Sequence, residues 1–144
     1  MKATDVIIYT DMDGTALTDW SLGPVVPERN LARIRAFVSA GGLFSVASGR
    51  QAPGILQLFP GVAFHAPLVC GNGSVIYDPA EQQVLRKTCL PPDYKCACVS
   101  YFLTHPEVWI VAADETRIWQ IVSGDPARDD QLNDWPRPRM SIED

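Results

Sequence analysis

The sequence lacks an apolar run long enough to cross a membrane, and it lacks an excess of basic residues. A membrane-spanning helix needs about 20 apolar residues, whereas the first apolar stretch, Val6 to Tyr9, has only the length of a strand. Lys and Arg together number 12 against 17 Asp and Glu, which gives a net charge of -5. Nucleic-acid binding needs a basic patch. We therefore expect neither a membrane nor a nucleic acid as a partner.

Histidine and cysteine are also scarce, with 2 and 4 residues. The cysteines do not form a C-x-x-C pair and no two histidines lie near them, so we do not expect a zinc site. Acidic residues flank the strand-length stretch that follows Met1 and Lys2, so it is not a signal peptide. Reduced thiols and no signal peptide predict a cytoplasmic protein. The cysteines are Cys70, Cys89, Cys96 and Cys98.

What the sequence does contain is an alternation of strand and helix patterns. Val6–Tyr9 is continuously apolar, which is typical of a strand buried on both faces of a parallel sheet. Pro27 suits the start of a helix, and Gly41-Gly42 suits its end. Alternating elements of this kind predict an α/β fold with a parallel sheet. The further expected elements are a strand at 43–47, a helix at 51–59, a strand at 67–70 and a hairpin of 74–77 with 84–87.

The pattern changes after Leu90, where Pro91-Pro92 predicts a boundary. We therefore predict two parts, residues 1–90 and residues 91–144. In the second part we expect a helix over 93–104 and a β-hairpin of 108–112 with 117–122. From Gly124 onward the sequence is polar and proline-rich, and we expect no regular element there.

The strongest chemical signal is Asp11-Met12-Asp13-Gly14-Thr15, directly after the first strand. Ligands of open α/β sheets bind outside the carboxyl ends of the strands. Two carboxylates so close together repel unless a proton or a cation neutralises them, and Mg²⁺ is the usual cation beside phosphates. The alternative is a plain turn, because Asp and Gly are turn formers.

This segment resembles motif I, D-x-D-G-T, of the haloacid dehalogenase-like (HAD) hydrolase superfamily. Ser48-Gly49-Arg50, after the second strand, is similar to its motif II. Asn72-Gly73 before a hairpin is similar to the segment that leads into the C2-type cap of the Cof-like subfamily. The resemblance implies a partial Rossmann-like parallel sheet, the HAD core, over residues 1–90. It also implies the start of an α+β cap over residues 91–144.

The resemblance also implies a function, namely Mg²⁺-dependent hydrolysis of small phosphorylated metabolites through an aspartyl-phosphate. Asp11 would be the nucleophile and Asp13 the general acid and base. The Asp11 carboxylate and the Asp13 carbonyl would bind the metal. Arg50 would reach a phosphate or only solvate the surface, and Asn72 would face the site or only shape a turn. The residues implied to bind the phosphoryl group are Gly14, Thr15, Ser48, Gly49, Arg50 and Asn72.

The family also needs a lysine (motif III) and a second acidic cluster (motif IV), which in Cof-like proteins follow a long cap. We therefore expect a truncated chain with little activity of its own. We also expect the sheet to expose an unpaired edge and an apolar face, which a homodimer would cover.

Two alternatives to a truncated enzyme remain, a compact phosphatase and a non-catalytic domain. Gly124-Asp125-Pro126-Ala127-Arg128-Asp129 fits a motif IV of the form G-D-x-x-x-D, with Lys87 or Lys95 as the motif III lysine of a compact, capless phosphatase. Otherwise Asp125 and Asp129 belong to a solvated loop. The chain would also fit a non-catalytic binding or regulatory domain of the same fold.

Overall fold

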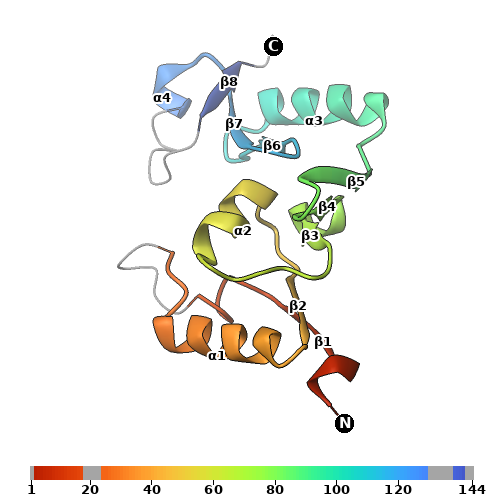
Figure 1. The fold of residues 1–144 in the computed structure, drawn as a ribbon. Coiled ribbons are helices and arrows are strands. Elements are labelled where there is room, and N and C mark those ends of the chain that lie inside the picture. The colour runs from red at the N-terminus through yellow and green to blue at the C-terminus, as the bar shows by residue number, and fades with distance from the viewer. Residues whose placement is uncertain (1, 18–23, 130–137, 142–144) are drawn as a thin grey trace. The chain divides into compact units, whose positions relative to one another are not determined.

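The structure, a computed structural model, describes residues 2–17, 24–129 and 138–141. The chain separates into two compact units, Met1–Thr88 and Cys89–Asp144 (Figure 1). Each unit is built from local α and β elements, so the mixed α/β fold predicted from the sequence is confirmed.

The first unit begins with a single 3-10 turn at Ala3–Asp5 and alternates strands and helices. Strand β1 (Ile7–Thr10) pairs in parallel with β2 (Leu43–Val46), and a parallel bridge from Ala47 to Val69 joins β2 to the next strand. That strand, β3 (Leu68–Cys70), pairs antiparallel with β4 (Val75–Asp78), which forms the predicted hairpin with β5 (Gln83–Lys87). The remaining elements of this unit are α1 (Glu28–Ser39), α2 (Ala52–Leu58) and a 3-10 turn (Gly71–Gly73).

Helix α1 begins and ends where the sequence predicts. Pro27 is its N-cap residue, and Gly41 follows its end with φ of +89°, a conformation that glycine adopts without strain. Phe44 and Val46 point to one face of β2, where they join Leu31 of α1 and Ile55 of α2 in the buried core. Both helices therefore cover the same face of the parallel strands.

Strand β1 differs from the prediction that it is buried on both faces. Ile7, Ile8 and Tyr9 are 49%, 41% and 43% exposed. Among the described residues β1 pairs only with β2, so its other edge has no neighbouring strand. Ile7 and its register partner Leu43, which is 38% exposed, lie on the face opposite α1 and α2. The expected open edge and exposed apolar face are therefore present.

The second unit contains the predicted helix and hairpin. Strand β6 is antiparallel to β7, with Asp114 in the turn between them. Contrary to the prediction, regular elements follow Gly124, namely a helical turn and a third strand parallel to β7. The elements are α3 (Pro92–Thr104), β6 (Val111–Ala113), β7 (Ile118–Val122), α4 (Pro126–Asp129) and β8 (Arg139–Ser141).

Strand β8 could not be predicted from the sequence because Pro138 precedes it. Proline has no N–H to donate and therefore argues against a strand. Its carbonyl is still an acceptor, and the Gln120 N–H donates to it at 2.9 Å. A three-residue strand of this kind is defined by its partner β7 and not by its own residues.

Candidate active site

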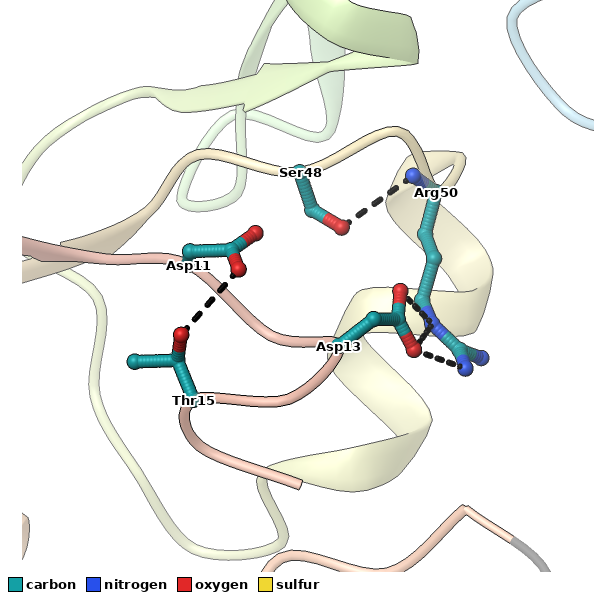
Figure 2. Close-up of polar contacts among 5 residues, drawn as sticks. All are labelled: Asp11, Asp13, Thr15, Ser48 and Arg50. Atoms are coloured by element: carbon teal, nitrogen blue, oxygen red, sulfur yellow. Dashed lines mark hydrogen bonds and ion pairs between the residues drawn. The ribbon is translucent and has the colours of Figure 1, made fainter. Parts of the chain in front are cut away.

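Three polar segments follow the three strands β1, β2 and β3. Asp11 comes directly after β1, Ser48 follows the residue that bridges β2 to β3, and Asn72 lies in the turn after β3. The carboxyl ends of parallel strands meet at one edge of a sheet, and β1, β2 and the start of β3 run in parallel. The sheet therefore brings together side chains that are widely separated in the sequence (Figure 2).

The loop after β1 exposes both carboxylates because it buries the residue between them. Met12 is 0% exposed, whereas Asp11 and Asp13 are exposed. The Met12 carbonyl accepts the N–H groups of Thr15 and Leu17 at 3.1 and 2.8 Å, which closes the loop into a tight turn. Gly14 has φ of +82°, where a larger residue would be strained.

The carboxylate of Asp11 is oriented by a neighbour in the same loop. The Thr15 hydroxyl donates to Asp11 Oδ2 at 3.2 Å (Figure 2). The resemblance assigned Thr15 to phosphate binding, but here its hydroxyl contacts a carboxylate.

The segment Ser48–Arg50 is fastened to the turn after β3. The N–H of Asn72 donates to the Ser48 carbonyl at 3.1 Å, and the N–H of Gly71 donates to the Arg50 carbonyl at the same distance. Asn72 has φ of 55° and ψ of 34°, the left-handed conformation that Asn tolerates better than most residues. Asn72 thus shapes the turn, and its side-chain amide lies against Gly49.

Arg50 forms an ion pair across the site with Asp13. Arg50 Nη2 lies 2.7 Å from Asp13 Oδ1, and Arg50 Nε lies 3.1 Å from Oδ2. Sequence reasoning left open whether Arg50 reaches a ligand or only solvates the surface, and it missed this pair. The two residues are 37 positions apart, and no sequence pattern links them.

The acidic segment considered for a compact phosphatase has a local structural role. The Asp125 carboxylate accepts the N–H of Ala127 at 3.0 Å, as a helix-capping residue does. Asp129 accepts the N–H groups of Ser123 and Gly124 and the Ser123 hydroxyl. Burial alone would raise the pKa of Asp129, but these bonds and the charge of Arg139 outweigh it and lower the pKa. Local hydrogen bonds therefore give both carboxylates a role within their own loop.

The donor atoms after β1 suit a hard divalent cation. Mg²⁺ prefers oxygen ligands and is commonly held by one or two carboxylates together with water and substrate phosphate. The exposed carboxylate of Asp11 and the carbonyl of Asp13 are ligands of this kind. The described residues contain no cluster of three or more His, Cys, Asp or Glu side chains that would enclose a metal without such additional ligands.

A groove of about 350 Å³ lies beside this loop, on the α1 side of β1. Ile8, Ile34, Phe37 and Phe44 give it a mostly apolar lining, and it contains none of the carboxylates described above. We therefore place the candidate site at the polar strand ends and not in the groove.

Comparison with known proteins identifies the class that this fold and strand-end constellation define. Residues 8–140 match the family model of haloacid dehalogenase-like hydrolases. The chain therefore belongs to the haloacid dehalogenase-like hydrolase family.

The relatives of the chain include phosphatases. It is 31% identical over 121 residues to the 5-amino-6-(5-phospho-D-ribitylamino)uracil phosphatase YbjI of Escherichia coli (strain K12), covering 84% of this chain and 43% of that protein. A haloacid dehalogenase-like hydrolase from Bacteroides thetaiotaomicron has a similar fold, with a TM-score of 0.69 at 21% identity over 96% of this chain and 52% of that one. A HAD subclass IIB sugar phosphatase gives 0.68 at 17% identity, over 96% and 53%. The chain thus spans about half the length of these relatives.

No helix among the described residues combines the length and the apolar character needed to cross a membrane.

Proposed function

We propose that this chain carries the nucleophile-bearing part of a Mg²⁺-dependent phosphatase that acts on small phosphorylated metabolites. The observation that carries the proposal is the exposed, oriented carboxylate of Asp11 at the end of β1, with Asp13 two residues further on. Membership of a hydrolase family with phosphatase relatives supports it.

In this proposal Asp11 attacks phosphorus and the ester oxygen leaves, so that an aspartyl-phosphate forms on Asp11. Carboxylates are established nucleophiles in such reactions. The hydrogen bond from Thr15 fixes the rotation of the Asp11 carboxylate, which reduces the number of unproductive orientations. Asp13 donates a proton to the leaving oxygen and afterwards takes one from the water that hydrolyses the intermediate.

The other strand ends would bind the phosphoryl group. Ser48 is only 6% exposed and its position is fixed through its main chain, so its hydroxyl can stabilise charge without costly rearrangement. Gly14 and Gly49 let the backbone approach the phosphate oxygens, and Arg50 and Asn72 complete this part of the site. The Asp11 carboxylate and the Asp13 carbonyl would hold Mg²⁺, which when bound neutralises phosphate charge.

The second unit fits the beginning of a cap, which we propose for residues 91–144. Its described residues form the helix α3, the single helical turn α4 and a small sheet, the α+β composition that the resemblance implies. The name of the E. coli relative states a phosphorylated ribitylaminouracil as its substrate, and we propose a small phosphate ester for this protein also. The site and its substrate require neither a membrane nor a nucleic acid.

A cytoplasmic location is part of the proposal. The four cysteines are free, as is usual in reducing compartments. Burial raises the pKa of the Cys70 thiol to about 11, so this thiol stays protonated at neutral pH. A homodimer that covers β1 is also proposed, because this strand has an open edge and exposed apolar side chains.

The test uses beryllium fluoride, which forms a phosphate-like adduct on a nucleophilic carboxylate. With Mg²⁺ present, ¹⁹F NMR of the chain should show a bound adduct that disappears in Asp11→Asn. Asp78→Asn is the matched control, since Asp78 caps the turn after β4. Phosphate binding without an Asp11-dependent adduct would instead support a non-catalytic binding domain.

A further inference from the structure

The carboxylate of Asp13 is engaged by the guanidinium of Arg50. It accepts Arg50 Nη2 at 2.7 Å, and Arg50 Nε lies within 3.2 Å of both its oxygens. Figure 2 shows Asp13 pointing toward Arg50, on the side away from Asp11. A carboxylate held in this way cannot at the same moment serve a leaving oxygen above Asp11.

The ion pair is accessible to a competing anion. The Asp13 side chain is 36% exposed and that of Arg50 is 23% exposed, so solvent reaches both partners. Partly exposed pairs of this kind are weak enough to exchange. Phosphate presents the same geometry to a guanidinium as a carboxylate does, with more charge and more acceptor oxygens.

Two hydrogen bonds hold the main chain of Arg50. Its N–H donates to Ser48 Oγ at 3.2 Å, and its carbonyl accepts the N–H of Gly71 at 3.1 Å. The main chain of Arg50 is therefore held at the strand ends, beside the serine proposed to bind the phosphoryl group, while rotation about the side-chain bonds can move the guanidinium.

We propose that Arg50 is a positioning residue that exchanges partners during binding. Before a ligand binds, it holds Asp13 away from Asp11. When a phosphate ester binds, the guanidinium transfers to the phosphoryl oxygens and frees the Asp13 side chain to turn toward Asp11. This inference rests on the proposed function. It adds that substrate binding itself releases the side chain that we propose as general acid and base.

The inference makes a prediction that an unchanging ion pair would not make. If phosphate must take Arg50 from Asp13, removing the Asp13 carboxylate should strengthen phosphate binding by more than the loss of one negative charge explains. Asp11→Asn is the matched control, because it removes an equal charge from the same loop but leaves the ion pair of Arg50 with Asp13 in place.

The experiment measures the dissociation constant of inorganic phosphate at fixed ionic strength for the wild-type chain, Asp13→Asn and Asp11→Asn. The same measurement is made for two double variants, in which each of these substitutions is combined separately with Arg50→Gln. We expect Asp13→Asn to bind phosphate about fivefold more tightly than Asp11→Asn, which corresponds to about 1 kcal/mol for a partly exposed pair. The difference should disappear with Arg50→Gln, since the coupling passes through Arg50.

A second measurement needs no substitution in the loop. The ¹⁵N NMR signal of Arg50 Nε in the wild-type chain should move as phosphate is added, and an unmoved signal in a chain that binds phosphate would overturn the exchange. Equal affinities of Asp13→Asn and Asp11→Asn, or a difference that persists with Arg50→Gln, would overturn it also and leave the proposed function intact. A wild-type chain that does not bind phosphate would contradict both.

Discussion

The side-chain amide of Asn72 packs closely against Gly49. A β-carbon placed on Gly49 would lie 3.1 Å from Asn72 Oδ1 and 3.3 Å from Nδ2, closer than such atoms normally approach. The N–H of Asn72 also donates to the carbonyl of Ser48. Glycine at position 49 thus suits the close approach of two loops at the strand ends, and its own φ is not the reason.

Replacing Gly49 by alanine should therefore separate these loops. We expect Gly49→Ala to lower the free energy of unfolding by about 1 kcal/mol, the lower end of the usual cost of overpacking. Gly54→Ala in α2 is the matched control, because a β-carbon there meets nothing within 4 Å. It should raise the stability by about 0.5–1 kcal/mol, since alanine favours a helix. Urea unfolding measures the free energy of unfolding of both variants. Equal changes in the two would show that the Asn72 side chain moves aside at little cost and would contradict the prediction.

The hydroxyl of Ser48 should matter for turnover more than for folding. In a preparation with measurable phosphatase activity, we expect Ser48→Ala to lower kcat about 10²-fold, as loss of one preorganised donor usually does. Ser48→Thr keeps the hydroxyl and should retain most of the activity. The circular dichroism melting curve checks that the alanine variant is folded. Unchanged kinetics in Ser48→Ala would make Ser48 a residue of the turn alone.

The turn between β6 and β7 should lose stability in strong acid. The N–H and hydroxyl of Thr116 and the N–H of Arg117 donate to Asp114 and lower its pKa from 3.8 to about 2. Because the folded pKa is below the unfolded one, the stabilisation is complete above pH 3.8 and is lost as the pH falls toward 2. Asp114 is exposed, so we expect about 1 kcal/mol at most.

Urea unfolding of the chain as a function of pH measures this contribution. Asp114→Asn keeps an acceptor for the turn but removes the charge, so the difference in stability between wild type and variant should narrow below pH 3.8. A difference that stays constant down to pH 2 would contradict the assignment.

The exposed face of β1 should cause self-association. Ile7 is 49% exposed on a strand whose outer edge no strand among the described residues covers, a combination that favours pairing with another chain. We expect Ile7→Lys to shift the chain toward a monomer in light scattering across a concentration series. Val84→Lys is the control, since Val84 is 38% exposed on β5. A monomeric wild-type chain, or equal effects of the two variants, would contradict a role for β1.

Much of the first unit could be predicted from local sequence because each element carries its own signal. The apolar run before Asp11, Pro27 at the start of α1 and Gly41 at its end are features whose effect is decided within a few residues. Asp11, Ser48 and Asn72 could be placed together because strand ends of one parallel sheet meet at one edge.

The remainder depends on contacts between distant residues. The exposure of β1 depends on which layers cover the sheet, and apolar composition does not report that. Strand β8 is held by β7, and the ion pair of Arg50 with Asp13 depends on how two loops meet in space. Asp129 fits the second acidic position of a motif IV in the sequence, but its hydrogen bonds to the N–H groups of Ser123 and Gly124 could not be predicted from it.

Met12, buried between two exposed aspartates, couples stability to chemistry within three residues. The contacts that keep its side chain in the interior also decide where the flanking carboxylates point. The stability of the interior and the geometry of the candidate site therefore depend on the same residue. A change of side-chain volume at position 12 would change the orientation of the two carboxylates, although the Met12 side chain itself is buried.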